Sequence, residues 1–279
     1  MNLFFYLLIL ISILVIIGVF LYCYQERLIF LNGKKLQRAF PFKFSNNFQE
    51  IFLKTEDDQE INALHFKLEN PKGVVLFCHG NSGNIEKWGT KVSFFLDYNY
   101  EVVVFDYRKY GKSTGCFNET RMYSDALLMY DYLKSAFKEE NIVVYGFSLG
   151  STFAARIAAT NRPKELILEA PFFNFAKAVK FYSKFAPIFL LKYKFRTDLD
   201  IVKVTSPITV FHGNIDKTTS FQDSKRLLAL NASIENRFIE IDGGTHHNIR
   251  NSRLYLEKLQ EILKRSYFLN DIYCIFGIL

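Results

Sequence analysis

The chain begins with an apolar stretch that no charge interrupts. Residues 1–25 carry no charged side chain, and 21 of the first 24 residues are apolar. A helix of 22 residues, at about 1.5 Å each, spans about 33 Å and can cross a hydrocarbon core of about 30 Å. A cleaved signal peptide would need a basic start and small residues at its exit, whereas residues 21–24 read Leu-Tyr-Cys-Tyr. The pattern therefore predicts an uncleaved transmembrane anchor.

After the anchor, short β-branched and aromatic runs alternate with longer helical patterns, which predicts eight strands and five helices. The strands are expected at about 49–53, 61–67, 74–78, 102–106, 142–145, 166–169, 208–211 and 238–241. The helices are expected at about 86–96, 121–137, 148–159, 222–230 and 252–265, the last patterned by Leu254, Leu256, Leu259, Ile262 and Leu263. Strands that are apolar throughout, such as Val-Val-Val-Phe at 102–105, are typical of a parallel sheet covered on both faces. The fold class is therefore α/β, with an eight-stranded, mostly parallel sheet flanked by helices.

One segment breaks this alternation, because about two dozen residues of helical character separate two strands where a short crossover would suffice. Residues 171–197 hold six basic side chains and no acid. Such a segment can cover an acyl-sized pocket and lie on an anionic membrane, or it can bury its apolar side on the sheet and leave its lysines in water. We expect an anchor at 1–25, a juxtamembrane linker at 26–47, an α/β domain at 48–266 with a cap at about 172–196, and an apolar tail at 267–279.

Composition and charge narrow the class of protein. Of 279 residues, 49% are hydrophobic and 23% charged, which supports a packed core and excludes wholesale disorder. The formal charge of +7 favours anionic surfaces without separating nucleic acid from phospholipid. The four cysteines lie far apart with no CxxC pair, which argues against a disulfide framework or a zinc ribbon.

The residues after the anchor predict its orientation. Between residues 26 and 43 there are five basic side chains and a single acid, Glu26, whereas only the α-amino group is charged before the anchor. The positive-inside rule therefore places the α/β domain in the cytoplasm, with a lumenal or periplasmic location as the alternative.

Residues 143–150, Val-Val-Tyr-Gly-Phe-Ser-Leu-Gly, run from a buried strand into a helix rich in small residues. This is the context of a nucleophile elbow, in which Gly146 and Gly150 remove the side chains that would collide around the exposed hydroxyl of Ser148. A second copy of the five-residue pattern at 111–115 lies in a polar loop, so its Ser113 is expected to be a loop serine. The same copy lacks the first glycine of a phosphate-binding loop, because Asp106 stands there, which excludes a nucleotide site.

A serine hydroxyl needs a base and an orienting carboxylate. Asp216 follows the seventh strand, and His246 and His247 follow the eighth, which gives the order Ser, Asp, His that an elbow architecture requires. Neighbouring loop side chains diverge, so only one histidine can face Ser148. The glycines before His246 favour it as the base, with His247 as the alternative. A metal pair is disfavoured because further clustered ligands are missing.

The sequence Cys-His-Gly-Asn-Ser-Gly-Asn at 78–84 follows the third strand. Its glycines allow a turn in which the N–H of Asn81, together with that of Leu149, forms an oxyanion hole. His79 is expected to shape this turn, and Cys78 to be a core thiol.

Taken together, these motifs resemble the α/β-hydrolase superfamily over residues 25 to 265. The residues at 24–30, 79–84, 105–113, 146–150, 169–172 and 212–216 are similar to those of its membrane-anchored abhydrolase-domain branch. Known members include protein depalmitoylases, with lipases and prolyl-oligopeptidase-type peptidases as more distant relatives. Two departures stand out: Lys109 occupies a position that is usually glycine, and the histidine is doubled. The resemblance implies a serine hydrolase without a metal or organic cofactor, with Ser148 as nucleophile, Asp216 as orienting acid, His246 as base, and Asn81 and Leu149 as amide donors.

The leading hypothesis is a membrane-tethered serine hydrolase that cleaves acyl esters or thioesters through an acyl-enzyme. Its partners would be such a substrate and membrane lipid, with no nucleic acid. One alternative is a serine peptidase of the prolyl-oligopeptidase-like type. Another is a non-catalytic membrane adaptor that keeps the fold.

Overall fold

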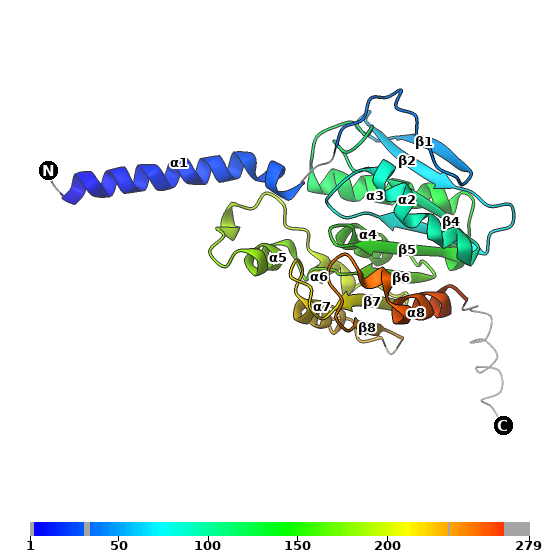
Figure 1. Cartoon of the computed structure of the whole chain (residues 1–279). Coiled ribbons are helices and arrows are strands. Elements are labelled where there is room, and N and C mark those ends of the chain that lie inside the picture. The colour runs from blue at the N-terminus through cyan, green and yellow to red at the C-terminus, as the bar shows by residue number, and fades with distance from the viewer. Residues whose placement is uncertain (1–2, 31–33, 234, 265–279) are drawn as a thin grey trace.

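The computed structural model describes residues 3–30, 34–233 and 235–264, so the predicted tail at 267–279 lies outside the described residues. Figure 1 shows a long helix, α1 (Leu3–Ile29), that projects from an α/β domain. Within the described residues, this is the one helix long and apolar enough to cross a membrane, and none of its apolar window is buried. The helix continues beyond the predicted anchor, through the charged side chains of Glu26 and Arg27.

Eight strands form one sheet in the order β1-β2-β4-β3-β5-β6-β7-β8. The β1–β2 and β2–β4 pairs are antiparallel, and the other pairs are parallel. The predicted fold class is confirmed, and each predicted strand is present with its ends within two residues of the expected ones. The strands are β1 Phe48–Lys54, β2 Glu60–Phe66, β3 Gly73–Cys78, β4 Tyr100–Phe105, β5 Ile142–Phe147, β6 Glu165–Glu169, β7 Ile208–Gly213 and β8 Arg237–Ile241.

Helices cover both faces of this sheet. The α-helices are α2 Ile85–Val92, α3 Glu119–Lys134, α4 Gly150–Thr160, α5 Phe175–Tyr182, α6 Thr197–Ile201, α7 Phe221–Leu228 and α8 Arg253–Lys264. The short 3-10 helices are η1 Ser93–Tyr98, η2 Glu139–Asn141, η3 Ile188–Leu190 and η4 Ile249–Asn251. One core cluster contains side chains of α3, α4, α6 and α7, and the other contains side chains of α2, η1 and α8. The sheet is therefore the middle of three layers.

Two predicted helices differ in detail from the observed ones. The helix expected at 86–96 ends at Val92 and continues as η1, which closes at Asn99 in a left-handed conformation. On α8, Leu254 and Leu256 were expected to face the core but are 40% and 41% exposed, whereas Tyr255 is buried. The hydroxyl of Tyr255 lies 2.8 Å from that of Tyr145, and this contact sets which face of α8 meets the sheet.

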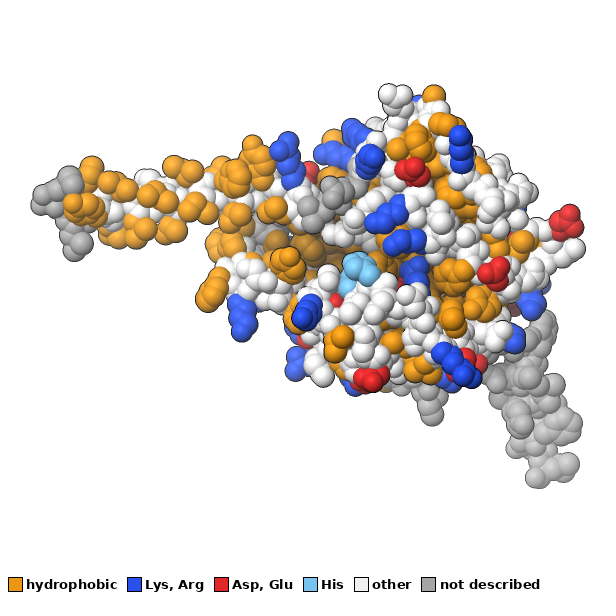
Figure 2. Space-filling model, in the orientation of Figure 1, with side chains coloured by type: hydrophobic (Ala, Val, Ile, Leu, Met, Phe, Trp, Pro, Cys, Tyr) orange, Lys and Arg blue, Asp and Glu red, His pale blue; other side chains and the backbone are white. Residues whose placement is uncertain are grey.

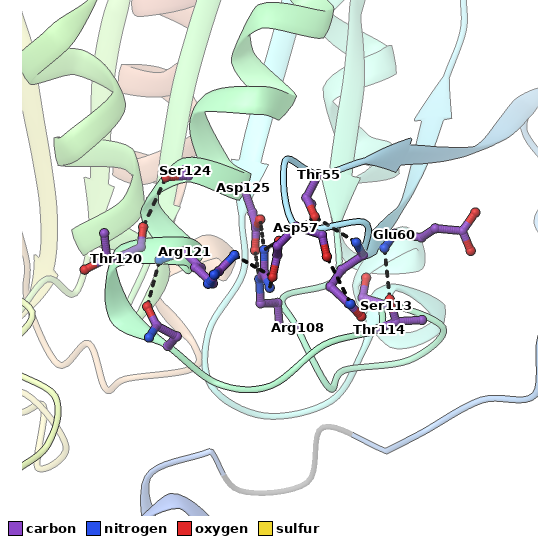
Figure 3. A network of polar contacts seen from close by, with 12 residues as sticks. Thr55, Asp57, Glu60, Arg108, Ser113, Thr114, Thr120, Arg121, Ser124 and Asp125 are labelled. Carbon is purple, nitrogen blue, oxygen red and sulfur yellow. Dashed lines mark hydrogen bonds and ion pairs between the residues drawn. The ribbon is translucent and has the colours of Figure 1, made fainter.

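A buried arginine ties three segments together next to the sheet (Figure 3). Arg108, in the loop after β4, donates to the Asp57 carboxylate at 2.7 Å and to the Asp125 carboxylate of α3 at 2.6 and 2.9 Å. Arg121 adds a second ion pair to Asp57 at 2.6 Å. The guanidinium of Arg108 holds the pKa of Asp57 below its usual range. The network fixes the β1–β2 turn and α3 to the loop that leads towards the site.

Candidate active site

Ser148 lies immediately after β5 in a left-handed conformation, with φ of 51°, and α4 begins at Gly150. A Cβ on Gly146 would lie 2.6 Å from the Cα of Ser151, and a Cβ on Gly150 would collide with the carbonyl oxygen of Cys78. Both glycines are therefore required by close backbone approach. A strained serine between a strand and a helix is the geometry that presents a hydroxyl at the carboxyl edge of a sheet.

The structure brings Ser148, His246 and Asp216 together from three separate loops. The Oγ of Ser148 lies 3.0 Å from Nε2 of His246, and Nδ1 of His246 lies 2.7 Å from Oδ2 of Asp216. His246 and Asp216 are buried, at 6% and 7% exposure. An ionised Asp216 accepts the Nδ1 proton, which leaves Nε2 free to accept the proton of Ser148.

His246 is not the only group that contacts the carboxylate of Asp216. The amides of Thr218 and Thr219 donate to Oδ1 at 2.6 and 3.0 Å, and Nε2 of His212 lies 3.2 Å from Oδ2. Burial acts to raise the pKa of Asp216, but the hydrogen bonds of His212, His246 and the Thr219 amide hold it below its usual range. His212 was not among the predicted site residues. The signal that could have identified it is its position near the end of β7, four residues before Asp216.

His247 points elsewhere. Its ring makes no hydrogen bond to Ser148 or Asp216 among the described residues, and it lines a separate cavity of about 440 Å³ with Trp88, Lys91 and other side chains. Partial burial, together with the charges of His246 and Lys91, lowers the pKa of His247. The histidine within reach of Ser148 is thus His246.

The turn after β3 orients two peptide planes. Nδ1 of His79 lies 2.6 Å from the carbonyl oxygen of Gly80, and the hydroxyl of Tyr110 donates to the carbonyl of Asn81 at 2.7 Å. Because C=O and N–H point in opposite directions in a trans peptide, the bond to Gly80 directs the N–H of Asn81 away from His79. Within the described part of the chain, the N–H groups of Asn81 and Leu149 donate no hydrogen bond. Both are free for a ligand oxygen.

The second serine motif has a structural role. Ser113 is buried, donates to the carbonyl of Asp106 at 2.7 Å and accepts from the N–H of Asn62 at 2.9 Å. In the same loop, Lys109 has a φ of 67°, which glycine adopts more readily, and its ammonium lies 3.6 Å from Glu26 of α1. The departure from glycine at this position therefore adds a contact between the loop and α1.

Cys78 is buried in the core at the end of β3, and burial raises the pKa of its thiol. A deprotonated thiol would be disfavoured there, so this cysteine packs as a small apolar side chain. Over residues 3–30, 34–233 and 235–264, no group of three or more His, Cys, Asp or Glu side chains could hold a metal ion.

Sequence comparisons agree with this architecture. Residues 69–201 match the family model Hydrolase_4, described as serine aminopeptidase, S33. The lysophosphatidylserine lipase ABHD12 of Macaca fascicularis is 26% identical over 257 residues, which cover 75% of this chain and 64% of that protein. Protein bem46 of Schizosaccharomyces pombe is 32% identical over 165 residues, 55% of each chain. The chain spans about half to two thirds of the length of most of the lipases it matches.

Solved structures share the fold. The esterase Pf2001 of Pyrococcus furiosus superposes with a TM-score of 0.66 at 19% identity, covering 82% of this chain and 97% of that one. An α/β hydrolase of Vibrio vulnificus gives a TM-score of 0.66 at 20% identity, covering 77% and 81%. Together with the sheet order and the sequence matches, these similarities identify the fold as that of the α/β hydrolases.

The chain has the α/β-hydrolase fold. Its similarity to ABHD12 and bem46 supports the abhydrolase-domain branch that the motifs predicted. These relationships support a hydrolase, and the apolar N-terminal helix is consistent with a membrane anchor.

Proposed function

We propose that this protein is a membrane-anchored serine hydrolase that cleaves acyl esters or thioesters. The observation that carries the proposal is the chain of contacts from the Ser148 hydroxyl through His246 to Asp216, at 3.0 and 2.7 Å. A serine paired with an imidazole, itself oriented by a buried carboxylate, is the arrangement that activates a hydroxyl for acyl transfer.

In the proposed reaction, Nε2 of His246 takes the proton of Ser148 as Oγ attacks the carbonyl carbon of the substrate. The N–H groups of Asn81 and Leu149 stabilise the tetrahedral oxyanion, each contributing roughly 3 kcal/mol. The protonated His246 then gives its proton to the leaving alcohol or thiol, which leaves an acyl-enzyme. Water, deprotonated by the same nitrogen, releases the carboxylic acid and restores Ser148.

The surroundings of the site and the names of the sequence relatives support a lipid substrate. Figure 2 shows an apolar hollow beside a histidine, between the end of α1 and the cap. Several relatives are named lysophosphatidylserine lipases, which favours an acyl ester of a membrane lipid as the substrate here. We infer that residues 1–25 cross the membrane once, that the linker 26–47 leads to the catalytic domain at 48–266, and that this domain faces the cytoplasm.

A fluorophosphonate probe tests the nucleophile, because it reacts with an activated serine. We expect Ser148→Ala to abolish labelling and Ser113→Ala to retain it, with circular dichroism checking that both variants fold. Labelling that persists in folded Ser148→Ala would refute the assignment.

A substrate panel tests the reaction class. The purified protein is given lipid and synthetic acyl esters, acyl thioesters and short peptides. Turnover is expected with esters or thioesters, whereas faster cleavage of peptides would favour the peptidase, a reading that the description of the matched family model supports. Folded protein that neither turns over a substrate nor reacts with the probe would favour an adaptor.

A further inference from the structure

The cap carries large apolar side chains that no part of the described chain covers. Phe181 is 44% exposed, Tyr182 82%, Phe185 96% and Phe189 83%. They follow one another along the chain from the end of α5 to η3. Clustered exposed aromatic side chains are unfavourable in water and mark a surface that meets something else.

The charge around these aromatic side chains has one sign. Residues 172–197 contain six basic side chains and no acid. Lys180 and Lys184 are exposed and form no ion pair with a described residue, whereas Lys177 lies 3.5 Å from Asp223 of α7. Aromatic side chains beside unpaired lysines are the composition of a surface that binds an anionic bilayer interface.

The cap lies alongside the apolar part of α1. Gln25 donates to the carbonyl of Leu190 at 3.0 Å and accepts from the N–H of Lys192 at 2.8 Å. The side chain of Leu190 reaches further, to 3.8 Å from where a Cβ on Gly18 would stand. Gly18 precedes Gln25 by about 10 Å along the helix axis, well inside the uncharged stretch. Figure 1 shows the segment that holds α5 and η3 projecting beside α1.

If α1 crosses a membrane, a segment that reaches Gly18 cannot stay in the aqueous phase. We propose that the tip of the cap, residues 181–190, inserts into the anionic leaflet next to α1. The inference rests on the membrane anchoring in the proposed function. The aromatic side chains occupy the boundary between headgroups and acyl chains, and Lys180 and Lys184 contact lipid phosphates and carboxylates.

This placement brings the apolar hollow between α1 and the cap next to the leaflet (Figure 2). The acyl chains of a lipid substrate can contact this hollow from the membrane.

The test places single tryptophans in the full-length chain, reconstituted in vesicles that contain brominated phosphatidylcholine and phosphatidylserine. The natural Trp88 is the only tryptophan and is 4% exposed, so it gives a constant, unquenched background. Phe185→Trp reports the cap, Val15→Trp on α1 reports the bilayer interior, and Leu254→Trp on α8 is the control for an exposed apolar position outside the cap.

We expect bromine to quench Phe185→Trp and Val15→Trp but not Leu254→Trp. Quenching of Val15→Trp without quenching of Phe185→Trp would overturn the insertion of the cap and leave the anchor intact. If neither is quenched, the insertion and the anchoring both fail. Fluorophosphonate labelling of the same samples reports the hydrolase separately.

A second arm tests the charge. In the Phe185→Trp background, replacing part of the phosphatidylcholine by phosphatidylserine should increase quenching, and Lys180→Glu should remove that increase. Lys264→Glu on α8 makes the same charge change outside the cap and should leave the increase in place. Quenching that does not respond to phosphatidylserine would overturn the anionic part of the proposal.

Discussion

Two adjacent histidines have different surroundings. His246 contacts both Ser148 and Asp216, whereas His247 lies against the cavity that Trp88 and Lys91 line. Neighbouring backbone positions in a loop turn their side chains in different directions, so the doubled sequence does not imply a doubled function.

Substitution of the two histidines should therefore lower kcat by unequal amounts. His246→Ala should lower kcat by about four to six orders of magnitude, because no other described side chain forms a hydrogen bond with the Ser148 hydroxyl. His247→Ala is the matched control and should lower kcat far less. Steady-state kinetics with an ester substrate decide, and a larger loss in His247→Ala would contradict the assignment of the base.

A second prediction concerns His212, which we expect to position Asp216. It lies 3.2 Å from Asp216 and does not contact Ser148, so His212→Phe should lower kcat by about tenfold to a hundredfold and leave KM unchanged. His212→Asn, which can still donate a hydrogen bond, should restore part of the loss. Equal effects of the two variants would mean that His212 only fills space.

Among the elements, α1 and the cap are joined by polar side chains near the end of α1, Gln25 and Glu26. Gln25 is buried at 6% exposure, and both ends of its amide bond to the cap backbone. The same end of α1 also contacts the turn after β3, because the side chain of Asn81 donates to the carbonyl of Ile29 at 3.1 Å. The C-terminal end of α1 is therefore part of the framework around the site.

Gln25→Ala should loosen the cap without disturbing the sheet. Two hydrogen bonds to the cap are lost, at roughly 1 kcal/mol each, so trypsin should cut faster at the exposed lysines of the cap. Gln37→Ala changes an exposed glutamine whose side chain has no hydrogen bond among the described residues, and should behave as wild type. Identical proteolysis of all three proteins would show that Gln25 does not hold the cap.

At the scale of the whole molecule, stability depends on the ion pairs around Arg108 (Figure 3). Its guanidinium is almost fully buried with Asp125, at 2% and 3% exposure of the two side chains. Removing one partner of such a pair leaves an uncompensated buried charge. Arg108→Met should therefore lower the free energy of unfolding by about 3 to 5 kcal/mol.

This loss should depend on pH in a defined direction. Arg108 holds the pKa of Asp57 below its unfolded value, so the stability from this pair is present above about pH 4 and is lost as the pH falls further. In Arg108→Met the buried Asp125 loses its partner. Because burial already raises the pKa of this carboxyl, the penalty of its charge is relieved by protonation as the pH falls. The Tm deficit of the variant should therefore be largest at neutral pH and should narrow on acidification.

Arg253→Met is the control for this experiment. Arg253 pairs with Glu257 on the surface of α8, where its side chain is 92% exposed, so its Tm should stay close to that of wild type at every pH. A Tm deficit of Arg108→Met that stays constant down to the acid range would contradict the role of the network.

Local sequence patterns determined most of the architecture. Each of the eight strands was predictable from short apolar runs between turn residues, and the long apolar helix α1 from its length and lack of charge. The loops that carry Ser148, Asp216 and His246 were predictable as well. In a parallel sheet, residues just past the carboxyl ends of strands meet at one edge, whatever the sequence between them.

Only the tertiary structure decided the contacts between segments that are distant in the sequence. The exposed Leu256 and the buried Tyr255 on α8, the support that His212 gives to Asp216, and the docking of Gln25 on Leu190, 165 residues away, all belong here. A periodic pattern specifies that a side chain lies on a face, but the direction in which it points depends on the partner that the folded chain brings to it. That physical limit separates the predictable frame of this protein from the particular contacts of its site.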